Sequence, residues 1–113
     1  MAALPKEKKS AIAAVLPSVM TKAMREDRRL RVLQSLLIAP ASVANESVLR
    51  GVLMEIGHAV SADLMRTELS WLDEQGLVDV VENGDLYVVR ITVRGRDVAR
   101  GLAKQPGVAI DEI

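Results

Sequence analysis

The amino-acid sequence predicts an α+β domain that is mainly helical, with one β-hairpin between two helices near its C-terminal end. The chain has 113 residues, which is enough for one domain with a modest core. It contains one Trp, one Tyr and no Phe, so aliphatic side chains must fill that core and helix packing is favoured. Residues 61–102 have the pattern of a helix, a tight hairpin and a second helix.

The N-terminal segment carries apolar residues at helical spacing, namely Ile12, Val15, Leu16, Val19, Met20, Ala23 and Met24. Pro17 lies within this stripe and removes one helical hydrogen bond, so we expect either a kink or two helices that meet near Leu16. The stripe has two interpretations. It packs onto the rest of the domain, or it forms a dimer interface with the candidate residues Ile12, Val15, Val19 and Met20.

Two further helices follow. The first of them is expected to begin at Asp27, as its N-cap, and to end before Pro40. The buried side of this helix would comprise Leu30, Leu33, Leu36 and Leu37. We expect Arg28, Arg29 and Arg31 on its outer face. Asn45 can cap the next helix, which carries the apolar residues Val48, Leu49, Val52, Leu53 and Ile56 before a turn at Gly57 and His58.

The third helix begins after Ser61, a predicted N-cap, and Gly76 is its predicted C-cap. Its core stripe would be formed by Leu64, Met65, Leu69 and Leu72. The outward positions are then Ala62, Asp63, Arg66, Thr67, Ser70 and Asp73.

The hairpin follows as two runs rich in branched residues, 77–81 and 86–91, separated by Asn83-Gly84. A two-residue turn there would place Val80 opposite Tyr87 and Val78 opposite Val89 on the buried face. The same turn would place the carboxylates of Glu82 and Asp85 opposite each other. Because this pairing is mildly unfavourable, a longer turn is favoured. The order helix, hairpin, helix is that of the second half of a winged helix-turn-helix domain, in which a recognition helix enters DNA and the hairpin forms the wing.

The last predicted helix begins at Thr92, its N-cap, and ends at Pro106-Gly107. We expect Val93, Val98 and Leu102 to be buried and Arg96, Arg100 and Lys104 to form a basic stripe. The domain organisation is therefore an N-terminal helical extension (1–24), a winged helix-turn-helix domain (25–105) and a C-terminal tail (106–113).

The formal net charge is zero, but the charges are segregated along the chain. Residues 1–31 hold eight Lys and Arg against three Asp and Glu, and residues 86–105 hold five against one. Residues 46–85, which include the predicted recognition helix, hold two against nine. A segregated neutral chain can still present the basic face that nucleic acid requires, and it also suits a charged protein partner.

Several classes of function are disfavoured. The chain has no cysteine, which removes disulfides, thiolate zinc sites and cysteine nucleophiles. His58 is the one histidine, most simply a turn residue, and no nucleophile elbow, phosphate loop or metal-ligand spacing accompanies it. We expect no enzyme, no cofactor and no metal. The apolar run after Lys9 stops at Pro17, so we expect neither a signal peptide nor a membrane span, and a cytoplasmic protein.

Residues 45–80 and 91–108 resemble a family of small winged-helix proteins of Mu-like transposable phages and prophages, described as similar to ArsR-type regulators. The resemblance covers residues 25–108, and its elements include Asp27-Arg28-Arg29, Asn45-Glu46-Ser47, Trp71-Leu72, Thr92 and Pro106-Gly107-Val108. The resemblance implies a phage-encoded protein in the bacterial cytoplasm, either a late regulator or a packaging accessory.

Two hypotheses follow. In the first, the protein is a regulator-like homodimer that binds double-stranded DNA. Arg66, Thr67 and Ser70 would read a groove, and phosphate contacts would come from Arg28, Arg29, Arg31, Arg94, Arg96 and Arg100. In the second, the protein is a non-catalytic interaction or oligomerisation module for another phage protein. The wing tip, Glu82 to Asp85, is anionic and favours the second hypothesis.

Overall fold

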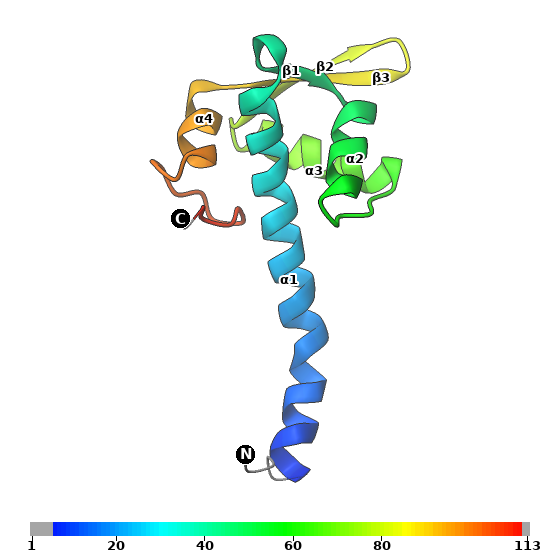
Figure 1. The fold of residues 1–113 in the computed structure, drawn as a ribbon, viewed down its shortest axis with the longest axis vertical. Helices are drawn as coiled ribbons and strands as arrows, with labels where there is room; N and C mark the ends of the chain where they lie inside the picture. The colour runs from blue at the N-terminus through cyan, green and yellow to red at the C-terminus, as the bar shows by residue number, and fades with distance from the viewer. Residues whose placement is uncertain (1–5, 112–113) are drawn as a thin grey trace.

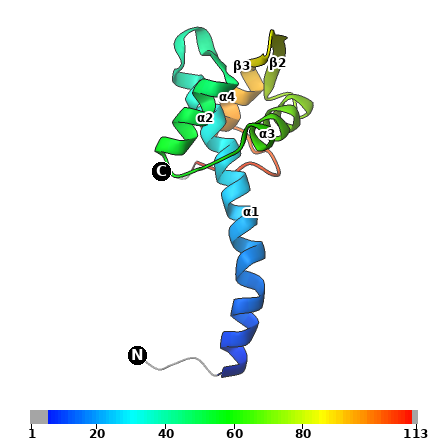
Figure 2. The ribbon, with the colours of Figure 1, turned by 90° about the vertical axis from the view of Figure 1, so that its right-hand side faces the viewer.

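The computed structural model describes residues 6–111, with the backbone alone at 6–10 and 12. It confirms a mainly helical α+β architecture in which four helices accompany a small antiparallel sheet (Figure 1). The elements are α1 (Lys6–Ile38), the 3-10 turn η1 (Pro40–Ser42), β1 (Val43–Asn45), α2 (Glu46–Glu55), α3 (Ala62–Glu74), β2 (Val78–Asn83), β3 (Leu86–Ile91) and α4 (Val93–Ala99). The molecule is elongated, with extents of 54 × 31 × 24 Å, because half of α1 projects from the body (Figure 2).

One continuous helix, α1, replaces the two separate helices that the sequence predicted. The prediction that Asp27 is an N-cap is wrong, because Asp27 lies inside α1. The alternative of two helices meeting near Leu16 is also wrong, since α1 continues through Pro17. Residues 18–30 contain no glycine and no further proline, so a single missing hydrogen bond at Pro17 does not end the helix.

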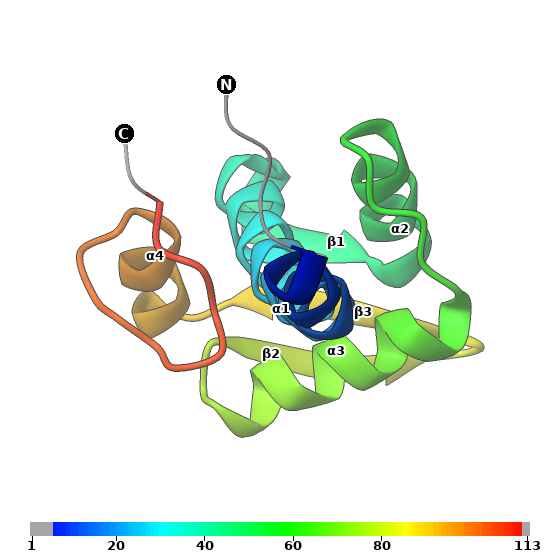
Figure 3. The ribbon, with the colours of Figure 1, turned by 90° about the horizontal axis from the view of Figure 1, so that it is seen from below.

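The core lies against the C-terminal half of α1, which α4 and α2 flank on either side while α3 and the sheet lie on a third side (Figure 3). Leu30, Leu33 and Leu36 are buried as predicted. The helices α2 and α3 contribute Leu49, Leu53, Met65, Leu69 and Leu72 to the same core. The expected burial of Val48, Val52 and Ile56 is wrong: they are 38% to 53% exposed, because α2 packs through one edge only.

Local signals set most of the helix ends. The predicted N-caps of α2, α3 and α4 are confirmed, since the side chains of Asn45, Ser61 and Thr92 each accept a backbone N–H. Gly76 ends α3 at a φ of +74° as predicted. The prediction for α4 is wrong at its C-terminal end, because Gly101 reverses the chain and the N–H of Leu102 bonds to the carbonyl of Asp97 in a Schellman motif.

The short α4 changes which of its residues are buried. Val93 and Leu102 are 77% and 74% exposed, so their predicted burial is wrong, whereas Val98 is buried as predicted. Gly95 takes the core position, and a Cβ there would lie 2.0 Å from the carbonyl oxygen of Leu77. Lys104 lies beyond the end of α4 and therefore does not extend a helical basic stripe.

The sheet has the strand order β1-β3-β2, and its hairpin register differs from the prediction. Val80 pairs with Val89 and Glu82 with Tyr87, so the two-residue turn is Gly84-Asp85 rather than Asn83-Gly84. This shift removes the Glu82–Asp85 pairing. It also makes Gly84 the first of the two turn residues, where its φ of +65° suits a glycine. The buried face is preserved, because the pairing moves by an even number of residues.

The C-terminal segment, predicted as a tail, lies against the body as far as residue 111. Val108 is buried, and the N–H of Ala109 donates to the carbonyl of Glu26 in α1. A Cβ at Gly107 would lie 2.8 Å from the Trp71 ring. The segment therefore covers the region where α1 meets α3.

Candidate interaction surfaces

Arg66 was the predicted base-reading residue of α3, and its guanidinium is already bound within the molecule. Its Nε and Nη2 donate to the two carboxylate oxygens of Glu46, at 2.9 and 2.7 Å. Nη2 also donates to the carbonyl of Asp85 in the hairpin turn, at 2.6 Å. The guanidinium lies over the Tyr87 ring, 4.5 Å from its centroid. Arg66 therefore joins α2, α3 and the hairpin.

Glu46 is the matching anion, and it is 4% exposed. The hydrogen bonds from Arg66 lower the pKa of the Glu46 carboxyl below its ordinary value, against the opposing effect of burial. The backbone N–H of Tyr87 also donates to this carboxylate, at 3.1 Å. The same pairing raises the pKa of Arg66. Both groups are held in their charged forms, so this ion pair stabilises the packing of α2, α3 and the hairpin.

The outer face of α3 and the hairpin beside it is mostly acidic. Thr67 and Ser70 are exposed as predicted, and the Thr67 hydroxyl donates to the carbonyl of Asp63 in its own helix. The exposed carboxylates of this α3–hairpin face are Asp63, Asp73, Glu74, Glu82 and Asp85. A groove of about 310 Å³ lies on it, lined by Ser70, Asp73, Glu74, Val80, Glu82 and Tyr87. This arrangement repels phosphate and suits a cationic or polar protein surface.

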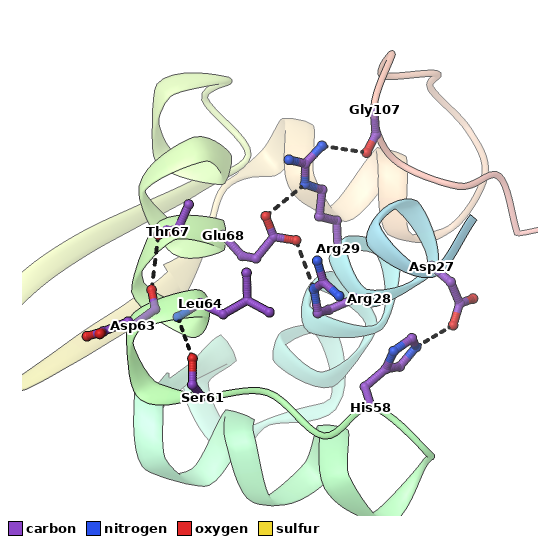
Figure 4. A network of polar contacts seen from close by, with 10 residues as sticks. All are labelled: Asp27, Arg28, Arg29, His58, Ser61, Asp63, Leu64, Thr67, Glu68 and Gly107. Atoms are coloured by element: carbon purple, nitrogen blue, oxygen red, sulfur yellow. Dashed lines mark hydrogen bonds and ion pairs between the residues drawn. The ribbon is translucent and has the colours of Figure 1, made fainter. Parts of the chain in front are cut away.

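Arg28 and Arg29 do not face outward, so that prediction is wrong. Both point from α1 toward α3, where the buried carboxylate of Glu68 accepts the Nε–H of Arg28 at 3.0 Å and of Arg29 at 3.3 Å (Figure 4). Their side chains are 12% and 11% exposed. Arg29 also donates to the carbonyl of Gly107 and stacks on half-buried Trp71, 3.8 Å from its centroid. These two arginines therefore hold α1, α3 and the C-terminal segment together.

Arg31 and His58 share Asp27 as a partner. The Nε of Arg31 lies 3.4 Å from one Asp27 oxygen, and His58 Nε2 lies 2.7 Å from the other. His58 does lie in the turn after α2, as predicted, but its side chain is buried and fastens that turn to α1 (Figure 4). Arg31 is half-exposed and remains within reach of solvent.

The helix α4, with Arg100 directly after it, lies at the opposite end of the hairpin from its turn, as the position of α4 in Figures 1 and 3 shows. Arg94, Arg96 and Arg100 are exposed. Arg94 donates to the side chain of Gln105, and Arg96 donates to the hydroxyl of Ser42. They form a basic edge that is separate from the acidic α3–hairpin face.

The projecting half of α1 presents an apolar stripe to solvent. Val15, Val19 and Met20, three of the candidate interface residues, are 55% to 58% exposed, and Leu16 and Met24 are 48% and 45% exposed. Ile12, the fourth candidate, lies outside the residues whose side chains are described. Within residues 6–111, no helix combines the length and apolar character that a membrane span requires. These apolar side chains are therefore not covered by the other elements within the described residues.

The buried carboxylates were missed from the sequence, although a signal exists for each. Glu68 follows Leu64 and precedes Leu72 by four residues, so it lies on the core stripe of α3. Glu46 likewise precedes Leu49 by three residues and Leu53 by seven. A charged residue on an apolar stripe requires a buried partner, and each of these has at least one arginine. No group of three or more metal-ligating side chains occurs within the described part of the chain.

Two relatives were found among known proteins. The uncharacterized protein gp26 of Escherichia phage Mu is 47% identical over 85 residues, which are 75% of this chain and 88% of gp26. An uncharacterized protein of Haemophilus influenzae is 47% identical over 64 residues, which are 57% of this chain and 62% of that protein. No family model matches the chain, and no solved structure matches it. At this identity and coverage, the chain belongs to the family of phage Mu gp26.

Proposed function

We propose that the protein is a non-catalytic interaction module that assembles with copies of itself and serves phage assembly or DNA packaging in the cytoplasm of the bacterial host. Its architecture is that of a winged helix-turn-helix domain extended by the projecting half of α1. The element order and the strand order β1-β3-β2 support this assignment. The relationship to phage Mu gp26 supports the phage context.

The observation that carries the proposal is the state of Arg66. It is the one long cation on the outer side of α3, and its guanidinium is committed to Glu46, to the carbonyl of Asp85 and to the Tyr87 ring. A bidentate contact to guanine needs these same donors. Without them, the α3–hairpin face offers DNA mainly carboxylates, so a protein surface fits it better.

DNA titration at low salt tests the proposal. A mixed-sequence duplex followed by fluorescence anisotropy is expected to show no binding at 50 mM salt, whereas light scattering is expected to show a dimer. A dimer that Val19→Asp and Met20→Asp dissociate, but Ser18→Asp on another side of α1 does not, would support association through the stripe. A monomer, or DNA binding that weakens when Arg66→Ala is introduced, would contradict the proposal.

A second candidate function is phosphate-directed DNA binding by the basic edge of α4, because Arg94, Arg96 and Arg100 are all exposed. In that case binding would fall steeply with salt. The variant R94A/R96A/R100A would reduce the salt dependence, and Arg66→Ala would leave it unchanged. The two variants thus separate the α4 edge from the α3–hairpin face.

A further inference from the structure

The apolar stripe of α1 runs into charges of opposite sign at its two ends. The sequence places Lys8 and Lys9 before the stripe, and Glu26 and Asp27 after it. Positions 8 and 26 are 18 residues apart, as are 9 and 27, which is roughly five turns at 3.6 residues per turn. Helical spacing therefore assigns positions 8, 9, 26 and 27 to the same face of α1 as the apolar residues between them.

The stripe and its charges have the same midpoint. The centre between the lysine pair and the carboxylate pair falls between Pro17 and Ser18. This is also the centre between Val15 and Met20, the outer residues of the exposed apolar group that includes Leu16 and Val19. A twofold axis through this point would place Val15 against Met20 and Leu16 against Val19 of a second helix.

The body limits how far a second helix can extend along α1. Beyond Asp27 the next residue on the same face is Leu30, which is 2% exposed and belongs to the core. The C-terminal segment is fastened to α1 at Glu26, and the turn after α2 is fastened at Asp27. A partner helix centred at Pro17 and Ser18 would bring its Lys8 and Lys9 to this boundary, beside the carboxylates.

We infer that the projecting half of α1 pairs with the same segment of a second copy in antiparallel orientation, with the lysine pair of each copy beside Glu26 and Asp27 of the other. This inference rests on the proposed function, because it specifies the orientation of the proposed dimer. A parallel pair would bury the same apolar residues. It would, however, bring lysine pair against lysine pair and carboxylate pair against carboxylate pair, and like charges in contact are unfavourable.

Charge reversal distinguishes the two orientations. For the antiparallel dimer, the variant K8E/K9E is expected to raise the dissociation constant roughly tenfold in analytical ultracentrifugation, since each dimer contains the contact twice. Glu26→Lys is expected to act in the same direction, and K8E/E26K is expected to recover most of the loss. Glu26 is preferred to Asp27, whose carboxylate also contacts His58 and Arg31. Tighter dimerisation of K8E/K9E would overturn the inference in favour of a parallel pair.

Spin labels provide a second measurement that does not depend on charge. The chain lacks cysteine, so Ala11→Cys, Ser18→Cys and Arg25→Cys each give one label site at heptad spacing along one side of α1. In the antiparallel dimer the two labels at position 18 lie close together. Those at position 11 are separated by about 20 Å along the axis at 1.5 Å per residue, and those at position 25 by a similar offset.

Three outcomes are informative. A short distance at position 18 with long distances at 11 and 25 supports the antiparallel pair. Similar distances at all three positions overturn the inference and leave the proposed dimer standing. A sample without intermolecular coupling contradicts both the inference and the proposed function. Circular dichroism of each variant checks that α1 remains helical.

Discussion

The two halves of α1 have similar aliphatic composition and opposite surroundings. In the C-terminal half, Leu30, Val32, Leu33 and Leu36 are at most 2% exposed, whereas Val15, Leu16, Val19 and Met20 in the N-terminal half are 48% to 58% exposed. Apolar residues follow helical spacing in both halves, but only those of the C-terminal half are covered by other elements. An apolar stripe alone therefore does not tell whether it is buried, and only the position of α1 relative to the other elements decides which part of it enters the core.

The largest expected difference between the halves is in the stability of the body. Leu33→Ala removes a fully buried side chain, so we expect the free energy of unfolding to fall by about 4 kcal/mol. Val19→Ala, its matched variant in the projecting half, is expected to change it by less than about 0.5 kcal/mol in dilute protein, where association is absent. Urea denaturation followed by Trp71 fluorescence measures both, because Trp71 lies within the body. Equal losses would show that the projecting half stabilises the body directly.

Removing the ion pairs that connect Glu68 of α3 to α1 is expected to cause the next largest loss of stability. Glu68→Gln leaves the guanidinium groups of Arg28 and Arg29 largely buried without their carboxylate, at a cost of about 3 kcal/mol. Glu74→Gln, on the exposed side of the same helix, is the control and is expected to change the stability by less than about 0.5 kcal/mol. Thermal unfolding measures both variants. A small effect at Glu68 would mean that apolar packing alone positions α1.

The smallest effect is expected at the ion pair that lies away from α1. Glu46→Gln weakens the contacts with Arg66, but Arg66 is 41% exposed and can be resolvated, so the loss is expected to be about 1 kcal/mol at pH 7. Because the pKa of Glu46 is lowered on folding, its stabilising contribution is present above the ordinary value of 4.5 and is lost as the pH falls through the folded value. Urea titrations at pH 7 and pH 3.5 should therefore show a smaller difference between the two proteins in acid. A difference independent of pH would contradict the ionised pair.

Local features were predictable from the sequence. The caps Asn45, Ser61 and Thr92 and the turn at Gly76 depend on hydrogen bonds within a few residues, so the sequence indicates them directly. The buried face of the hairpin was also predicted, whereas its register was not. Whether the turn is Asn83-Gly84 or Gly84-Asp85 depends on a weak repulsion between Glu82 and Asp85 and on contacts to Arg66 from another element.

The candidate site was less predictable, because its side chains are defined by contacts between distant residues. Arg66 was correctly placed on the outer side of α3, but its partner Glu46 lies 20 residues earlier. Arg28 and Arg29 were assigned to the surface, yet Glu68, about 40 residues later, draws them into the interior. Sequence patterns assign a residue to a face of its own helix, and the partner that binds it emerges only when the helices pack.

By itself, the sequence determined where α2, α3 and α4 begin, that Gly76 ends α3, that a hairpin follows α3, and that α1 carries an apolar stripe. These features depend on short-range hydrogen bonds and on the periodicity of one element. The tertiary structure decided that α1 is one helix with a free half, that three arginines are bound by two buried glutamates, and that carboxylates dominate the α3–hairpin face. Burial and ion pairing between elements depend on how separate segments pack, and no single segment encodes that arrangement.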